Sequence, residues 1–169
     1  LRVPAVYGPG DHRPWGYLKK MLDNRPAILL GEASSQWRFI RGYVDDVADA
    51  IVRATTNQTA AGRVYNVGES DPVLEQEWVG AIAKAVGWTG EIRVLPEIDM
   101  PKHIQMANPK QHLTYDTTRI RKDLGWESPT DFETGLTRTI DWELEHLPEN
   151  YDTSVFDYDA EDRALAGLD

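Results

Sequence analysis

The stretch LRVPAVYGPGD, residues 1–11, decides how the chain is expected to fold. Its first six residues are apolar except for Arg2, a pattern typical of a strand buried inside a parallel sheet. The turn residues Gly8, Pro9 and Gly10 then end the strand. A natural N-terminus is usually more polar than this one, so we expect that the chain begins inside a longer protein.

Strand and helix patterns alternate along the rest of the chain. The segments 32–36 and 98–114 show no period and are expected to be loops. Alternating strands and helices indicate an α/β protein with parallel pairing, so we expect a few parallel strands together with a small mixed α/β lobe. Apolar or β-rich runs predict strands at 27–30, 37–44, 63–68 and 91–96, and helical spacing predicts helices at 14–23, 47–54, 74–86, 117–124 and 131–147.

Single residues mark where several of these elements begin, bend or end. Gly42 interrupts one expected strand and predicts a β-bulge or a close approach of another segment. Asp45 or Asp46 is expected to cap the helix that follows, because a helix start favours capping over catalysis for these two acids. Gly87 and Gly125 each follow the last apolar position of a helix and are expected to end it.

The composition is that of an ordinary globular protein, with 41% hydrophobic and 27% charged residues. The 28 acidic residues outnumber the 18 basic ones and give a net charge of -10, which argues against binding to nucleic acid or to an anionic membrane. The absence of cysteine excludes disulfides and thiolate chemistry and fits the cytoplasm, the location that we expect. The four histidines lack metal-ligand spacing, so no metal site is expected.

Five blocks, taken in order, carry a resemblance to a known family. They are LRVPAVYGPGD (1–11), RGYVDDVADAI (41–51), YNVGE (65–69), DTTRIRKDLGW (116–126) and GLTRTIDW (135–142). In this order and spacing they resemble the C-terminal half of extended short-chain dehydrogenases/reductases, the NAD(P)-dependent epimerase/dehydratase group. The resemblance covers residues 1 to about 145 and implies the C-terminal portion of a Rossmann-type enzyme. Residues 1–148 would form its substrate-binding part, and residues 149–169 an acidic C-terminal tail, either loosely held or packed on a partner.

The family's N-terminal half carries the Gly-rich dinucleotide loop and a catalytic Tyr-x-x-x-Lys pair, and neither motif occurs in this sequence. No residue of the chain is therefore assigned as catalytic, and the chain alone is expected to be inactive. The resemblance implies NAD or NADP as the cofactor, bound mainly by the missing half. It further implies that Val3, Pro4, Ala5 and Val6 wall the nicotinamide end of that cofactor.

The resemblance implies substrate contacts for Arg38, Arg41, Tyr7 and Lys110. In nucleotide-sugar members an arginine before the V-x-D motif grips the phosphates, a task suited to the bidentate guanidinium. Arg38 lies one residue too far from that motif, unless a bulge at Gly42 absorbs the difference. Tyr7 is interpreted as packing rather than catalysis, because without a nearby lysine its pKa stays at about 10. Lys110 is the only cation of the loop NPKQHLTY, where the family often has an arginine.

The substrate and the reaction type remain open at this stage. Ala5 stands where nucleotide-sugar members often have an asparagine, so the substrate is either a sugar nucleotide or another hydroxyl or carbonyl compound. Epimerase, dehydratase and reductase activities are all compatible with the five blocks. The alternative is a non-catalytic ligand-binding or regulatory module derived from the same fold. The expected partners are a small-molecule substrate and further copies of the protein in a homo-oligomer.

Overall fold

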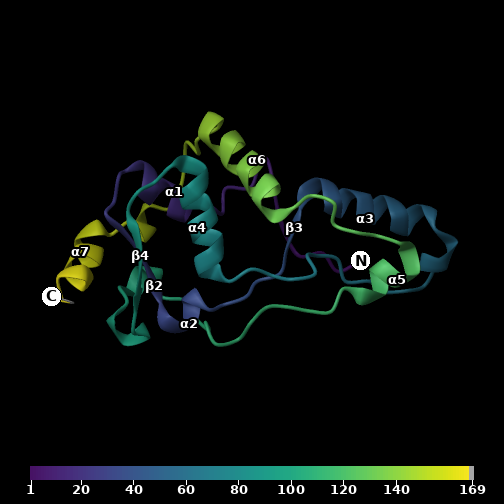
Figure 1. Cartoon of the computed structure of the whole chain (residues 1–169), viewed down its shortest axis with the longest axis horizontal. Helices are drawn as coiled ribbons and strands as arrows, with labels where there is room; N and C mark the ends of the chain where they lie inside the picture. The colour runs from purple at the N-terminus through teal and green to yellow at the C-terminus, as the bar shows by residue number, and fades with distance from the viewer. Residues whose placement is uncertain (168–169) are drawn as a thin grey trace. The chain divides into compact units, whose positions relative to one another are not determined.

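A computed structural model describes residues 1–167 of the chain, and Figure 1 shows its helices and strands in chain order. Helices and parallel strands alternate, which confirms the expected α/β class. The strands are β1 (Ala5–Tyr7), β2 (Ala27–Gly31), β3 (Arg41–Tyr43) and β4 (Glu91–Leu95). The helices are α1 (Trp15–Leu22), α2 (Glu32–Ser35), α3 (Val44–Thr56), α4 (Glu75–Val86), α5 (Thr118–Leu124), α6 (Phe132–Glu145) and α7 (Tyr158–Ala166). Short 3-10 turns are η1 (Gln58–Ala60), η2 (Glu97–Asp99), η3 (Lys102–Ile104) and η4 (Thr153–Val155).

The chain divides into two compact units. The first unit contains Leu1–Asp11, Arg38–Val73 and Leu113–Glu145, and the second contains His12–Trp37, Leu74–His112 and the residues from His146 onward. Because each unit is assembled from three separate segments, neither coincides with the expected division at residue 148, which stays a prediction.

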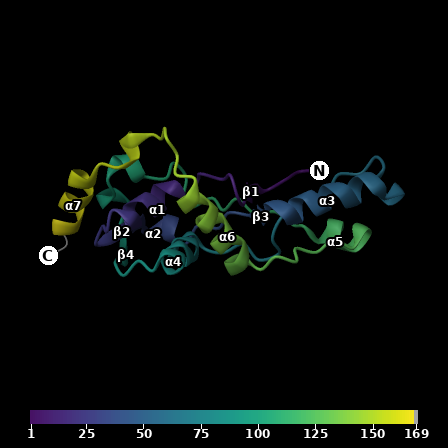
Figure 2. The same ribbon diagram turned by 90° about the horizontal axis from the view of Figure 1, so that it is seen from above.

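The first unit is built on the parallel pair β1–β3, which lie side by side in Figure 2. Their register runs without a break from Ala5 opposite Arg41 to Tyr7 opposite Tyr43. Of the two alternatives expected for Gly42, a β-bulge or a close approach, the structure therefore shows the second. Gly42 allows this approach, since a Cβ atom there would lie 2.8 Å from Pro4 Cγ.

Within the expected strand at 63–68, the structure shows one isolated β-bridge, which pairs Asn66 with Arg2. The Arg2 amide donates to the Tyr65 carbonyl at 2.8 Å, and the Val67 amide donates to the Arg2 carbonyl at 2.9 Å. One face of α3 covers this region and closes a core with α5. The buried core residues are Val47, Ala50, Tyr65, Val67, Ile120, Leu124 and Trp126.

The second unit is built on the parallel pair β2–β4, with Ala27 opposite Glu91 and Gly31 opposite Leu95. All five residues of β2 are buried, as its unbroken apolar run predicts for a strand covered on both faces. On one face, Ala27, Leu29, Leu95 and Met100 form a core cluster. Helices α1 and α4 pack against each other in the same unit.

Two further local predictions are wrong. The expected loop at 32–36 contains the short helix α2, whose first turn is held by a distant side chain. Glu97 Oε1 accepts hydrogen bonds from the amides of Ala33 at 2.9 Å and Ser34 at 3.1 Å. Helix α3 begins at Val44 after Tyr43, so neither Asp45 nor Asp46 is its N-cap, although both lie in the first turn, where acidic side chains favour the helix dipole.

The sequence did locate the C-terminal ends of α4 and α5. Gly87 and Gly125 adopt left-handed conformations, with φ of 66° and 59°, directly after α4 and α5. Asp131 Oδ1 accepts from the Thr134 amide at 2.9 Å at the start of α6. Among residues 1–167, no helix combines the length and apolar character that crossing a bilayer requires.

Candidate functional site

The carboxyl ends of β1 and β3 form the candidate site of the first unit. Parallel strands present ligand sites at this edge, where the loops that follow the strands diverge. β1 ends at Tyr7 and continues into Gly8, which has a φ of 148°. A Cβ atom at Gly8 would lie 2.5 Å from Val44 Cγ1, so the glycine is required for the chain to turn away here.

Glu69 belongs to this site through its side-chain hydrogen bond with Tyr7, the last residue of β1, and the sequence analysis did not assign it. Its amide donates to the Arg41 carbonyl at 2.9 Å, which holds the Glu69 backbone beside the first residue of β3. Burial raises the pKa of the Glu69 carboxyl to about 7, and the charge of Asp46 adds to this effect, against the opposing influence of Arg41 and a hydrogen bond with Tyr7. With its pKa in this range, the Glu69 carboxyl can accept or donate a proton near neutral pH. The signal in the sequence was its place as the last residue of the block YNVGE.

The Tyr7 side chain is buried and belongs to the same cluster. Burial, followed by the charge of Glu69 and a hydrogen bond with it, raises the pKa of the Tyr7 phenol well above its usual range. Tyr7 therefore stays protonated at neutral pH. The expectation that its pKa stays at about 10 is wrong, because the sequence did not show its burial beside Glu69. Its ring stacks edge-on against Tyr43, with centroids 5.7 Å apart.

The two arginines proposed for substrate contact differ in exposure. The Arg41 side chain is buried, lies 5.3 Å from the Phe39 ring centroid and donates to the Phe39 carbonyl at 3.3 Å. The Arg38 side chain is 40% exposed, donates to the Pro72 carbonyl and lies 3.9 Å from the Asp71 carboxylate. Arg38 can thus meet a solute directly, while the charge of Arg41 acts on Glu69.

The structure brings only some of the proposed residues together. Tyr7 and Arg41 both influence Glu69 in the first unit, whereas Lys110 is exposed in a loop of the second unit. Val3 is half exposed, and Pro4 packs against Gly42. Ala5 and Val6 lie in β1 opposite Arg41 and Gly42. Whether these side chains bind ligand stays a prediction.

The second unit contains a cavity of about 300 Å³ between α1, the end of β2 and the segment around η3. Leu29, Met100 and Ile104 contribute apolar walls, and Lys20 and His103 contribute nitrogen atoms. This combination of apolar walls with a few polar groups is typical of a small-molecule pocket.

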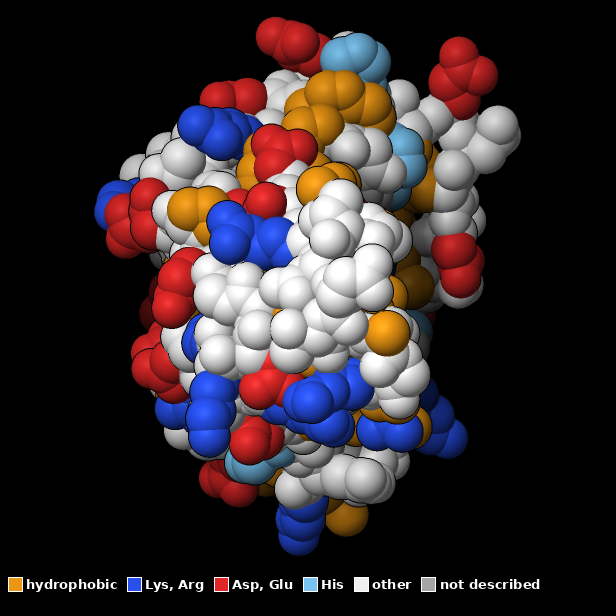
Figure 3. Space-filling model, turned by 90° about the vertical axis from the view of Figure 1, so that its right-hand side faces the viewer, with side chains coloured by type: hydrophobic (Ala, Val, Ile, Leu, Met, Phe, Trp, Pro, Cys, Tyr) orange, Lys and Arg blue, Asp and Glu red, His pale blue; other side chains and the backbone are white. Residues whose placement is uncertain are grey.

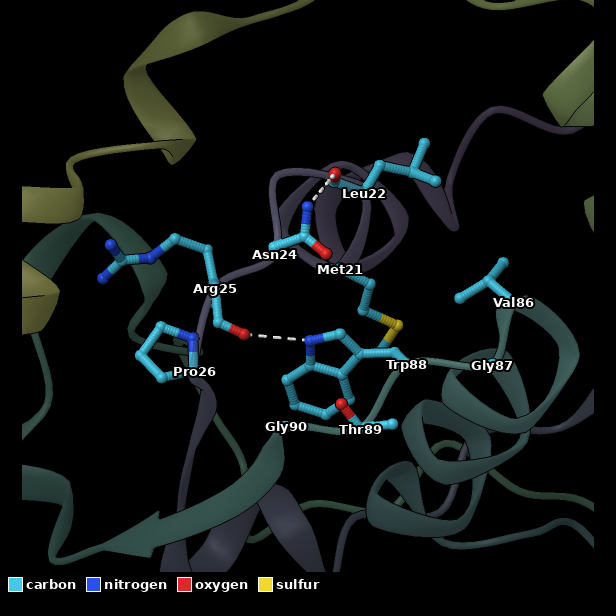
Figure 4. A pocket seen from close by; sticks show the side chains of 10 residues that line it. All are labelled: Met21, Leu22, Asn24, Arg25, Pro26, Val86, Gly87, Trp88, Thr89 and Gly90. Carbon is cyan, nitrogen blue, oxygen red and sulfur yellow. Dashed lines mark hydrogen bonds between the residues drawn. The ribbon is translucent and has the colours of Figure 1, made fainter.

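A wider hollow of about 460 Å³ lies between the C-terminal ends of α1 and α4 and is shown in Figure 4. The Trp88 indole N–H donates to the Arg25 carbonyl at 2.9 Å across this hollow. The Arg25 guanidinium is directed away from Trp88 in Figure 4 and pairs with Asp162. Arg25 is the charged residue among those that line this hollow, and its guanidinium already forms an ion pair with Asp162.

Figure 3 shows the surface at the α3 and α5 end of the first unit, where basic and acidic side chains are interspersed. Arg63 and Arg119 both approach the Asp123 carboxylate there, at 3.0 and 3.7 Å. Within the described part of the chain, no group of three His, Asp or Glu side chains is arranged to hold a metal ion.

Comparisons with known proteins agree with the sequence motifs. Residues 1–68 match the NAD dependent epimerase/dehydratase family, which confirms the resemblance drawn from the five blocks. The dTDP-glucose 4,6-dehydratase of Escherichia coli is 29% identical over 132 residues, covering 70% of this chain and 33% of the relative. The Streptomyces griseus enzyme of the same name is 27% identical over 132 residues, covering 77% and 37%. The chain thus spans only about a third of the length of these curated relatives.

Solved structures share the fold. The UDP-glucose 4-epimerase of Thermotoga maritima, solved with UDP-glucose, has a TM-score of 0.68 at 22% identity, covering 88% of this chain and 46% of its own. The UDP-glucuronic acid 4-epimerase of Bacillus cereus, solved with UDP-glucuronic acid and NAD, has a TM-score of 0.66 at 22% identity, covering 86% and 44%. These similarities confirm the expected Rossmann-type α/β fold.

Proposed function

Because residues 1–68 carry the pattern of NAD dependent epimerases and dehydratases, we propose that this chain is the substrate-side part of such an enzyme and that its substrate is a sugar nucleotide. The family match carries the proposal. It is supported by relatives named as dTDP-glucose dehydratases and by a structural neighbour solved with UDP-glucose. The whole protein would work in the cytoplasm as a homo-oligomer.

Arg38 is the residue best suited to the phosphates of such a substrate. Its guanidinium is partly exposed, whereas that of Arg41 is buried beside Phe39. A guanidinium binds phosphate oxygens through two parallel hydrogen bonds, which makes it a strong and directional partner. The buried Tyr7 and Arg41 side chains would support Arg38 from the interior of the first unit, and Lys110 stays a separate candidate for substrate contact in the second unit.

The cofactor would be NAD or NADP, which accepts or donates a hydride at its nicotinamide ring. The residues present at β1 fit the nicotinamide end, because Val3 offers an exposed apolar side chain and Pro4 has no amide hydrogen to leave unpaired. Val3, Pro4, Ala5 and Val6 would form one wall beside the ring and exclude water from it. The sequence holds neither a Gly-rich dinucleotide loop nor a Tyr-x-x-x-Lys pair, so we propose that this chain alone does not catalyse hydride transfer.

Calorimetric titration of the chain with UDP-glucose and dTDP-glucose tests the substrate assignment. Arg38→Gln should weaken binding of the accepted nucleotide about tenfold or more, since a charge-assisted hydrogen bond contributes about 1.5–3 kcal/mol. Arg53→Gln is the matched control, because Arg53 is equally exposed but pairs only with its own helix and the Gly125 carbonyl. If neither nucleotide binds, or if the control loses as much affinity, the substrate assignment is wrong.

The reaction is tested on the protein encoded by the complete reading frame, supplied with the nucleotide that binds and with NAD or NADP. An epimerase or dehydratase returns the hydride to its substrate, so the readout is the product: chromatography should show conversion of the sugar nucleotide by that protein and none by the 169-residue chain. Tight nucleotide binding without turnover with either cofactor would instead favour a non-catalytic binding module.

A further inference from the structure

The C-terminal residues 151–167, called here the C-terminal strap, pack against the second unit. Helix α7 places Ala164 and Leu165 on the apolar cluster that includes Leu29 and Leu95 of the parallel strands. In both ribbon views α7 lies beside β2 and β4 (Figures 1 and 2). Of the two arrangements expected for these residues, a loose tail or an arm on a partner, neither describes this docking on the chain's own strands.

An aromatic series and polar contacts hold the outer side of the strap. The Tyr151 ring packs edge-on against Trp15 at a centroid distance of 5.5 Å and against Phe156 at 5.7 Å. The Tyr158 hydroxyl donates to Asp23 Oδ2 at 2.6 Å, and the Arg25 guanidinium lies 4.5 Å from the Tyr158 ring centroid. These contacts lie near the surface, where such interactions are individually weak.

The inner side of the strap is held by one fully buried carboxylate, Glu161. Its Oε1 atom accepts from Lys20 Nζ at 2.5 Å and lies 3.1 Å from His103 Nε2. Its Oε2 atom is buried without a hydrogen-bond partner. A buried carboxylate oxygen without a partner is costly, because it has lost water and gained nothing in return. The docked strap therefore buries Glu161 in a site where only one of its two carboxylate oxygens has a hydrogen-bond partner.

The two residues that bind Glu161 also line the cavity of about 300 Å³ in the second unit. Lys20 and His103 border it from α1 and η3, and the strap itself contributes Val155 to its wall. The docked strap thus has two effects on the cavity. It closes part of the wall, and it occupies two nitrogen-bearing side chains of the cavity, Lys20 and His103, beside a third cation of the lining, Arg13.

We propose that Glu161 is a built-in anionic ligand of this cavity, and that a small anionic molecule competes with it for Lys20 and His103 and so releases the C-terminal strap. The shared chemistry is an oxyanion, either a phosphate or a carboxylate group, carried by a molecule small enough for the cavity. An external anion that also finds a partner for its second oxygen would displace a carboxylate whose Oε2 has none. This inference does not depend on the proposed function of the chain.

Hydrogen exchange of the amides of 158–167 tests the proposal on the whole chain. Sodium phosphate and sodium acetate are compared with sodium chloride at equal ionic strength, which removes general screening of the ion pair. One or both oxyanions should accelerate exchange of the strap several-fold over chloride, and the more effective of the two identifies the ligand chemistry. Equal exchange in all three salts would overturn the proposal.

Glu161→Gln keeps the shape of the side chain and removes its charge. In this variant the strap amides should exchange at least about tenfold faster in chloride, with no further rise in the effective oxyanion. Asp159→Asn is the matched control on the same helix, because Asp159 is exposed, and it should behave like the wild type. A control that responds as strongly as Glu161→Gln would also overturn the proposal.

If Glu161→Gln loosens the entire second unit, seen as faster exchange in β2, a milder variant replaces it. Tyr158→Phe removes only the bond to Asp23 and leaves the Glu161 cluster intact. Its strap should exchange a few-fold faster and should still respond to the oxyanion. Loss of that response in Tyr158→Phe would contradict the role given to Glu161.

Discussion

Lys20 Nζ and Glu161 Oε1 lie 2.5 Å apart although 141 residues separate them in the chain. Both side chains are almost completely buried. A buried pair of this kind is costly to break, since removal of one partner leaves a charge without water or counterion. The pair therefore fixes the C-terminal segment to α1 and makes the stability of the second unit depend on both residues together.

Lys20→Met should lower the free energy of unfolding by about 3–5 kcal/mol, because it leaves the buried Glu161 charge without its principal partner. The double variant Lys20→Met with Glu161→Leu should recover most of the lost free energy of unfolding, since two apolar side chains can pack together without leaving a buried charge unpaired. Urea denaturation of the wild type, the single variant and the double variant measures both values. A double variant that is no more stable than the single one would show that the pair is not coupled.

The stability of the first unit should depend on pH through Glu69. Its pKa is raised from 4.5 in the unfolded chain to about 7 by burial, so the folded state binds more protons between these values. The free energy of unfolding should therefore be highest below about pH 4.5 and fall by about 3 kcal/mol as the pH rises through about 7.

Glu69→Gln should remove this pH dependence, because the amide does not titrate. Urea denaturation at about pH 5 and about pH 8 gives the comparison, and the wild type should lose stability between the two while the variant should not. A wild type that gains stability over this interval through the same residue would mean that Glu69 titrates below its ordinary range.

Two adjacent acids of α3 should differ sharply in importance. Asp46 accepts hydrogen bonds from Ser128 Oγ at 2.6 Å and from the Thr130 amide and hydroxyl at 3.2 and 2.8 Å, whereas Asp45 is exposed. Asp46→Ala should cost about 3 kcal/mol or more, since each bond to a buried carboxylate contributes about 1.5–3 kcal/mol. Asp45→Ala should cost less than about 1 kcal/mol, the contribution of a charge to the helix dipole. Thermal unfolding of the two variants decides, and equal losses would contradict this account.

Two helical glycines form a second matched pair. A Cβ atom at Gly135 of α6 would lie 2.9 Å from the Tyr7 hydroxyl and 3.0 Å from Tyr43 Cδ2, whereas at Gly80 of α4 the nearest atom, Ile92 Cδ1, is 3.9 Å away. Gly135→Ala should therefore destabilise by about 1–2 kcal/mol, after the gain in helix propensity is subtracted from the cost of overpacking. Gly80→Ala should stabilise by up to about 1 kcal/mol. Denaturation midpoints measure both, and stabilisation at Gly135 would show that α6 moves freely away from β1.

The sequence by itself determined the features that depend on neighbouring residues. Apolar spacing located α1, α4 and α6. Gly87 ended α4 and Gly125 ended α5 as expected, because this type of helix end requires a residue in the left-handed conformation, which glycine adopts readily. Five ordered blocks indicated the family that residues 1–68 match. These signals depend on neighbouring residues or on the order of motifs along the chain, so the amino-acid sequence alone reveals them.

Only the tertiary structure decided the features that depend on distant partners. Helix α2 forms where a loop was expected because Glu97 binds its first amides, 63 and 64 residues away. Glu69 acquires its raised pKa from burial beside Tyr7, Arg41 and Asp46, and no pattern around it shows that burial. The C-terminal strap docks through Glu161, whose partners Lys20 and His103 come from two other segments. Burial and ion pairing act through space, so their consequences for each residue exist only once the chain has folded.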